Sequence, residues 1–149
     1  MKFKVLHRWE ILTESENKKL VREIFDVMKN DIDELEKYLA DDISFWTADY
    51  VLQGKDQIIP VWISFFKEQM KPKELKILNL IAQGNHVAAE AVARATHIGE
   101  WGGVPATGKE VTWNMVYIFE FEDGKVKSWK DYFNIEGYTD KQTELFLRA

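Results

Sequence analysis

The sequence of 149 residues contains no cysteine. This absence excludes disulfide bonds, zinc–thiolate sites and thiol nucleophiles. It suits a cytoplasmic protein, and we expect the chain in the cytoplasm. No run approaches the ~20 apolar residues that cross a membrane. Charged residues interrupt the stretch 1–12, which therefore lacks the unbroken apolar core of a signal peptide. We expect no membrane partner.

Basic residues are also too few for a nucleic-acid binder. The 20 lysines and arginines against 25 aspartates and glutamates give a net charge of −5, whereas such proteins gather a basic surplus on one face. We expect no nucleic-acid partner.

The glycine-rich stretch 99–108 precedes no predicted helix, which argues against a phosphate loop. The three histidines, His7, His86 and His97, lie far apart without a carboxylate-rich motif, and we expect no metal site.

Hydrophobic residues, by contrast, make up 46% of the sequence, and aromatic residues 13%. A chain of this length and composition predicts a single domain over 1–149 with one core. Residues 1–12 predict an N-terminal arm or strand. Apolar residues then recur at three and four through 20–28, which predicts a helix capped by Thr13 or Ser15.

Two more helices and a first strand are predicted before the chain reaches Pro72. Residues 32–39 predict a short helix, and 43–47 (ISFWT) are β-branched and aromatic, which favours a strand. The stretch 58–66 is apolar over a wide arc and predicts a third helix, with Pro60 in its first turn.

The remaining chain has an apolar period of two, which is typical of strands. It predicts four antiparallel strands, namely 74–83, 86–98, 109–122 and 125–134. Gly84-Asn85 and Asp123-Gly124 predict the tight turns. Residues 139–147 predict a closing helix. Helices followed by an antiparallel meander indicate an α+β fold.

Alternation along each strand assigns its side chains to two faces of the sheet. One face carries most of the aromatic residues: Trp113, Met115, Tyr117, Phe119, Phe121, Trp129, Asp131 and Phe133. The opposite face of the last strand carries Val126, Ser128, Lys130 and Tyr132. Three alanines lie on one face of the neighbouring strand, Ala91, Ala93 and Ala95. Their small side chains leave space beside the aromatic rings. The resulting groove is either a ligand cavity or a core filled by Trp62, Phe65 and Phe66.

Asp131 lies on this aromatic face, where an unpaired carboxylate is costly to bury. Two interpretations stay open. It is either ion-paired with Arg22, Arg94 or Lys130, or it is a functional acid–base group whose pKa the apolar surroundings raise. His97, at the end of its strand, is either an exposed surface group or a second proton carrier acting with Asp131.

Three segments together resemble the SnoaL-like polyketide cyclase family of the NTF2-like superfamily: 96–100 (THIGE), 103–109 (GVPATGK) and 119–133. The resemblance spans residues 16–134. It implies an NTF2-like, cystatin-like α+β cone, in which N-terminal helices pack in a strongly curved antiparallel sheet around one cavity. It also implies a homodimer formed through the opposite face of the sheet.

The family's chemistry implies a site that needs no cofactor and no metal. In the cyclases an aspartate at the position of Asp131 moves a proton, so we expect Asp131 as general base or acid, His97 as an assisting donor and Tyr117 as an enolate stabiliser. The ligand would be a small hydrophobic carbonyl compound undergoing cyclisation, isomerisation or dehydration. The expected pocket residues are Trp46, Trp62, Phe66, Ala93, Trp113, Met115, Trp129 and Phe133.

The last strand is also similar to that of limonene-epoxide hydrolases, but most of their polar machinery is missing. At the positions of the other polar catalytic residues of those hydrolases, this chain has Ala91, Ala93, Phe45 and Thr47. Ketosteroid isomerases place a base where this chain has Thr47. Two further interpretations therefore stay open beside an enzyme: a non-catalytic domain that binds a ligand in the same cavity, and a dimerisation module with a filled core.

Overall fold

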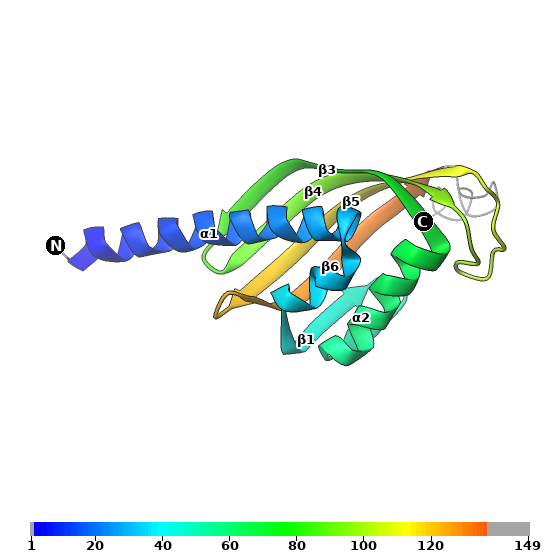
Figure 1. Cartoon of the computed structure of the whole chain (residues 1–149). Helices are drawn as coiled ribbons and strands as arrows, with labels where there is room; N and C mark the ends of the chain where they lie inside the picture. The colour runs from blue at the N-terminus through cyan, green and yellow to red at the C-terminus, as the bar shows by residue number, and fades with distance from the viewer. Residues whose placement is uncertain (1, 137–149) are drawn as a thin grey trace.

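The computed structural model describes residues 2–136 of the chain, and side chains from residue 13 onward. Helices lie on one side of a curved sheet (Figure 1). The predicted helix at 139–147 lies outside the described residues. The elements in chain order are α1 (Lys2–Asn30), the 3-10 helix η1 (Ile32–Tyr38), β1 (Leu39–Thr47), β2 (Val51–Gln53), α2 (Lys55–Ser64), the π-helical segment η2 (Phe65–Gln69), β3 (Met70–Gln83), β4 (His86–His97), β5 (Glu110–Glu122) and β6 (Lys125–Glu136).

The six strands form one sheet in the order β2-β1-β6-β5-β4-β3. Hairpins join β3 to β4 and β5 to β6, and the four predicted long strands are all present. The sheet is mixed, because β1 pairs with β6 in parallel while the other neighbours are antiparallel. The α+β cone is confirmed, with this parallel pair as the difference from an all-antiparallel sheet.

Helix α1 begins earlier than the sequence pattern indicated. Residues 2–12, predicted as an arm or a strand, belong to the helix, so the strand alternative is wrong for them. No glycine or proline occurs between residues 2 and 30 to interrupt the helix. Thr13 and Ser15, predicted as caps, therefore lie inside α1.

The second helix, α2, also starts before its predicted position. Gly54 adopts φ 85°, a left-handed conformation that glycine tolerates, and its carbonyl accepts the N–H groups of Gln57 and Ile58. Pro60 is thus the sixth residue of α2 and not in its first turn. The helix continues into η2, which turns the chain toward β3.

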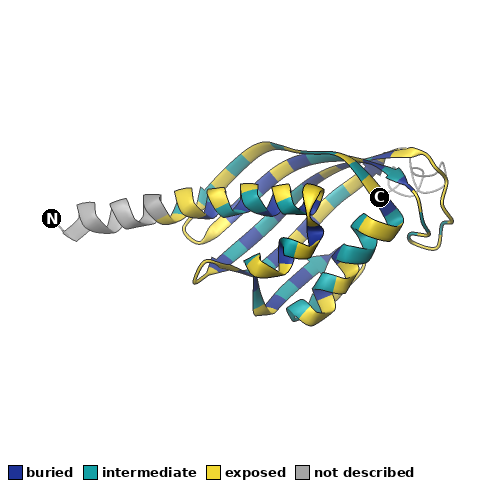
Figure 2. Cartoon of the chain, viewed as in Figure 1, coloured by how far each residue is buried: buried dark blue, intermediate teal, exposed yellow. Residues whose placement is uncertain are grey.

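The inner face of the sheet carries the core, and Figure 2 shows buried residues alternating along the strands. The predicted inner residues of β5, four aromatic residues and Met115, are all at most 7% exposed, and Val111 at the start of the same face is fully buried. One assignment on β6 is wrong. Glu120 pairs with Ser128 but Phe121 pairs with Val126, so Lys127 is an extra residue in β6. This bulge turns Val126 inward, where it is fully buried.

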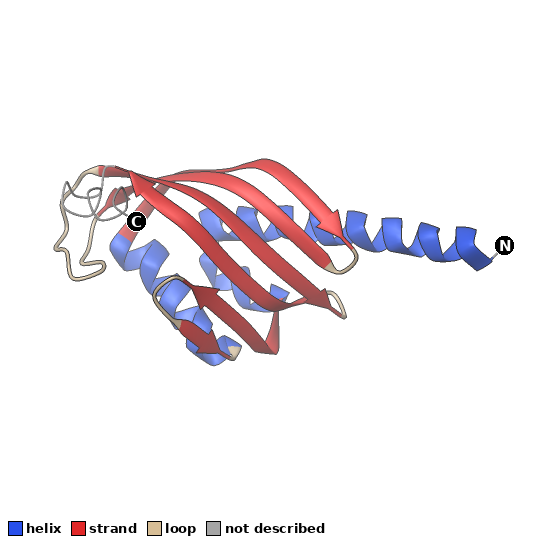
Figure 3. Ribbon diagram, turned by 180° about the vertical axis from the view of Figure 1, so that it is seen from behind, coloured by secondary structure: helices blue, strands red, loops and turns tan. Residues whose placement is uncertain are grey.

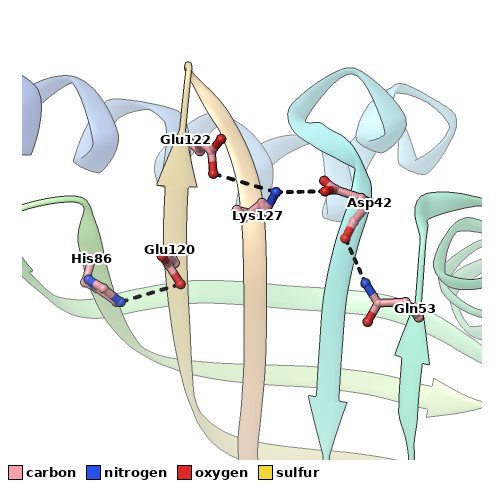
Figure 4. A network of polar contacts seen from close by, with 6 residues as sticks. All are labelled: Asp42, Gln53, His86, Glu120, Glu122 and Lys127. Atoms are coloured by element: carbon pink, nitrogen blue, oxygen red, sulfur yellow. Dashed lines mark hydrogen bonds and ion pairs between the residues drawn. The ribbon is translucent and has the colours of Figure 1, made fainter.

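Lys127 also joins three strands through a polar network on the surface (Figure 4). Its Nζ atom lies 2.7 Å from Asp42 of β1 and 3.7 Å from Glu122 of β5. The Gln53 side chain donates to the Asp42 carbonyl at 2.9 Å, which extends the network to β2. Exposed ion pairs of this kind contribute only ~0.2–1 kcal/mol each. The network lies at the irregular start of the parallel β1–β6 pair, and it favours one register there.

Candidate functional site

A cavity of about 380 Å³ lies over the inner face of the sheet. Its wall is formed by five of the six strands (all but β2), by α2 and η2, and by the loops after β1 and β4. The volume is in the range of small-molecule sites. The interpretation as a core filled by Trp62, Phe65 and Phe66 is therefore wrong: these three side chains form part of the wall and leave the space open.

Three polar side chains form a row across one end of this wall. Strand register places Thr47 of β1 beside Asp131 of β6, and Asp131 beside Tyr117 of β5. The three residues are 5%, 8% and 3% exposed, and all line the cavity. Side chains directly opposite on neighbouring strands are close enough to act together. We call these three residues the polar row.

Asp131 has no cationic partner in the part of the chain that the structure describes. Arg94 pairs with Glu74 at 3.3 Å, Lys130 is exposed on the opposite face of the sheet, and Arg22 is exposed on α1. The Oδ1 atom of Asp131 is buried without a hydrogen-bond partner. Burial raises the pKa of Asp131 from 3.8 to about 7. The ion-pair interpretation is therefore wrong, and Asp131 can both accept and return a proton near neutral pH.

Tyr117 stays protonated beside this acid. Burial, and secondly the charge of Asp131, raise the pKa of the Tyr117 phenol well above its ordinary value of 10. The ring is held by Phe25, Trp129 and Phe119, with centroids 5.6, 5.2 and 5.8 Å away. Tyr117 thus presents an O–H donor next to a carboxyl group in a largely apolar cavity.

Six of the eight predicted pocket residues lie in the cavity wall: Trp62, Phe66, Ala93, Trp113, Met115 and Phe133. Trp129 lies behind the wall, stacked on Trp62 with ring centroids 5.0 Å apart. Trp46 lies on the other face of the sheet, where its ring contacts Tyr132 at 5.0 Å. The alternation of ISFWT accounts for this position, because Phe45 and Thr47 face the cavity and Trp46 between them cannot.

His97 does not line the cavity, and it is not an exposed surface group either. It is fully buried, and its Nδ1 atom lies 3.0 Å from the Thr107 hydroxyl and accepts the Thr107 backbone N–H at 3.2 Å. An accepting Nδ1 carries no proton. His97 therefore holds the loop 98–109 in place, and the prediction of a second proton carrier acting with Asp131 is not supported by its position.

Sequence reasoning missed several wall residues, among them Thr47, Tyr50, Phe65 and Trp101. Thr47 could have been assigned from the alternation of its strand. Phe65 was assigned only to core filling. Trp101 comes from a loop, where no periodicity indicates which way a side chain points.

No group of three or more potential metal ligands lies together among the residues that the structure describes. None of the described helices is both long and apolar enough to span a membrane.

Comparison with known proteins adds to this geometry. The model of the SnoaL-like polyketide cyclase family matches residues 18–138. The chain belongs to this family. This SnoaL-like chain is similar in structure to AclR of Streptomyces galilaeus, a proposed hydroxylase, with a TM-score of 0.70 and 27% identity over 81% of this chain and 90% of that chain.

Two further structures share the fold of the SnoaL-like chain. A proposed polyketide cyclase from Xanthomonas campestris pv. campestris has a TM-score of 0.74 at 18% identity, covering 82% of this chain and 93% of that chain. An epoxide hydrolase of M. tuberculosis, described as LEH-like, has a TM-score of 0.68 at 20% identity, covering 91% and 92%. A search of curated proteins gave no match.

Proposed function

We propose that this SnoaL-like chain binds a small hydrophobic carbonyl compound and moves a proton on it, using Asp131 as acid and base. The observation that carries the proposal is a buried carboxyl group in the wall of an aromatic cavity, with no cationic partner among the side chains that the structure describes. A pKa near 7 suits a group that must take up and release a proton near neutral pH. Family membership supports the same chemistry.

In the proposed reaction, the Asp131 carboxylate removes a proton from the carbon next to the carbonyl group. The electron pair of the broken C–H bond moves onto the carbonyl oxygen, and the Tyr117 O–H donates a hydrogen bond to the resulting enolate. Asp131 then returns its proton. If the ketone is unsaturated, return of the proton to a different carbon of the conjugated enolate gives isomerisation. In ring closure, the enolate carbon instead attacks a second carbonyl of the same molecule, the π electron pair of that carbonyl moves onto its oxygen, and Asp131 gives its proton to the resulting alkoxide.

Exchange of the proton next to the carbonyl tests this step without knowledge of the natural substrate. Neutral aromatic ketones would be incubated with the protein in D₂O, and deuterium uptake would be followed by NMR. The expected result is uptake accelerated by the native protein and slowed on the order of 10²–10⁴-fold by Asp131→Asn. Tyr117→Phe is expected to slow exchange with little change in ketone binding.

The matched control is Asp26→Asn on α1, an exposed carboxylate that bonds to Asn30. It is expected to exchange at the native rate. Full exchange activity in Asp131→Asn would contradict the proposed role of this residue.

A non-catalytic binding domain is the second candidate function. It is favoured by the position of His97, which bonds to Thr107, so that no histidine lies among the described residues of the cavity wall as a second proton carrier. In that case the ketones would bind in the cavity, but the native protein would leave them without deuterium. The same incubation therefore separates the two candidates.

We also propose that the chain forms a homodimer through the face of the sheet opposite the cavity. None of the described helices covers that face (Figure 3). Apolar side chains from neighbouring strands gather on it: Ile81, Val92, Val116, Ile118 and Tyr132, of which Ile81 is 61% and Tyr132 45% exposed. An apolar area of this kind on a soluble domain marks an interaction surface.

A further inference from the structure

The loop between β4 and β5 contributes one aromatic ring to the cavity wall. Trp101 lies 5.8 Å from Phe65 of η2 and 5.8 Å from Trp113 of β5, measured between ring centroids. Its backbone forms a two-way bridge with Val104, with both N–H···O distances 3.0 Å. Gly102 and Gly103 make the turn between them with φ values of 58° and 77°. Trp101 is thus carried on a small hairpin.

Contacts at both ends fix this hairpin to the domain. At the start, the N–H groups of Ile98 and Gly99 donate to the Gln69 carbonyl at 2.9 and 3.2 Å. A Cβ atom at Gly99 would lie 2.0 Å from the backbone oxygen of Glu68, so the loop touches η2 directly. At the end, Thr107 bonds to the buried His97. The hairpin is therefore a fixed part of the wall.

The position of Trp101 defines a direction through the cavity. Trp113, which Trp101 contacts, is four residues from Tyr117 on the same face of β5. At 3.3–3.4 Å per residue, this separation is roughly 13 Å. Met115 of β5 and Phe133 of β6 line the wall between these two points and pair directly in the sheet. A ligand with its carbonyl group at the polar row would thus extend over apolar side chains toward Trp101.

Charge in the wall agrees with an uncharged ligand. Glu74 and Arg94 line the cavity and neutralise each other through their ion pair, while Asp49, in the loop after β1, adds a carboxylate to the same wall. Asp131, when ionised, would repel an anionic group placed near the polar row. The two carboxylates Asp49 and Asp131 thus disfavour an anionic ligand, and the mainly aromatic lining suits a neutral molecule with one polar end.

We propose that Trp101 closes the apolar end of the cavity and sets the maximum length of the ligand, an uncharged carbonyl compound whose apolar chain points away from the polar row. Trp101 is thus a specificity-determining residue. This inference rests on the proposed function, because it takes the polar row as the binding site of the carbonyl group.

A series of n-alkyl phenyl ketones with growing alkyl chains tests the length limit. Affinity would be measured by displacement of the neutral probe N-phenyl-1-naphthylamine, followed by the fluorescence of the probe. For the native protein, affinity is expected to rise roughly fourfold per added methylene until the chain reaches Trp101, and then to fall. In Trp101→Ala the rise is expected to continue to longer chains, and in Trp101→Phe the limit should lie between the two.

Trp46→Ala serves as the matched control, because Trp46 lies on the opposite face of the sheet, and it should keep the native limit. Circular dichroism would establish that each variant is folded. If Trp101→Ala does not fold, Trp101→Phe, which keeps an aromatic ring, still tests the length limit. An unchanged limit in the folded variants would overturn the role of Trp101 while leaving the proposed function intact. Failure of every ketone to displace the probe from the native protein would overturn the proposed function itself.

Discussion

Asp131 is stabilised in its protonated form by burial, which raises its pKa from 3.8 to about 7. Between these two pH values the folded chain holds a proton that the unfolded chain has released. The free energy of unfolding therefore falls as the pH rises through this window, and the loss is complete above pH 7. At about 1.36 kcal/mol per pH unit, the total is on the order of 4 kcal/mol.

Replacement of Asp131 by asparagine is expected to remove this loss. At pH 8 the variant should unfold at a higher urea concentration than the native chain, and the difference should shrink as the pH falls toward 4. Urea unfolding followed by tryptophan fluorescence at several pH values would measure it. Parallel stability curves for the two proteins across this range would show that Asp131 is not held in its acid form by the fold.

Individual residues differ in how far the sequence could place them. Asp131 and Tyr117 were found because period-two alternation fixes which face of a strand each side chain occupies. The same rule misplaced Val126, since a single bulge at Lys127 inverts the assignment of residues beyond it. His97 and Trp101 depend on how a loop folds back over the sheet, and no periodic pattern describes a loop.

Among the elements, hairpins were predictable and distant pairings were not. Asp123-Gly124 joins β5 to β6 within a few residues, and its positive φ values of 51° and 72° suit an Asp-Gly turn. By contrast, the parallel pairing of β1 with β6 joins segments some eighty residues apart, as Thr47 and Asp131 show. One of the three residues of the polar row, Thr47, joins the other two through that pairing, so its contribution is evident only in the fold.

One added methyl group tests whether contact with η2 determines the position of the loop after β4. Gly99→Ala places a Cβ atom against the Glu68 carbonyl, so the Trp101 hairpin must move. The expected results are a loss of about 1–3 kcal/mol in unfolding free energy and acceptance of longer ketones. Chemical unfolding and the probe-displacement series would measure the two effects.

Gly84→Ala, in the turn between β3 and β4, is the control for that experiment. Its added methyl group would meet nothing within 4 Å, although its φ of 58° is unfavourable for alanine. It is expected to lower stability by roughly 1 kcal/mol while keeping the native length limit. A native length limit in Gly99→Ala would show that the contact with η2 does not position Trp101.

At the scale of the whole molecule, the uncovered face of the sheet makes a prediction about assembly. Val116→Lys places a charge in the middle of the proposed dimer interface, beside Tyr132 and Glu90. The expected result is a monomer in sedimentation velocity experiments, against a dimer for the native chain. Asp26→Lys on α1, an exposed position on the other side of the sheet, is the control and should remain dimeric. A native chain that sediments as a monomer would contradict the proposed assembly.

The order of strands also determines when the chain can fold during its synthesis. β6 is the last described strand to leave the ribosome, yet its place in the sheet is between β1 and β5. Until it arrives, both of these strands have an open edge of unsatisfied backbone groups, which invites aggregation. A nascent chain that ends before β6 therefore exposes both edges, and Asp131 can meet Thr47 and Tyr117 only after β6 has been made.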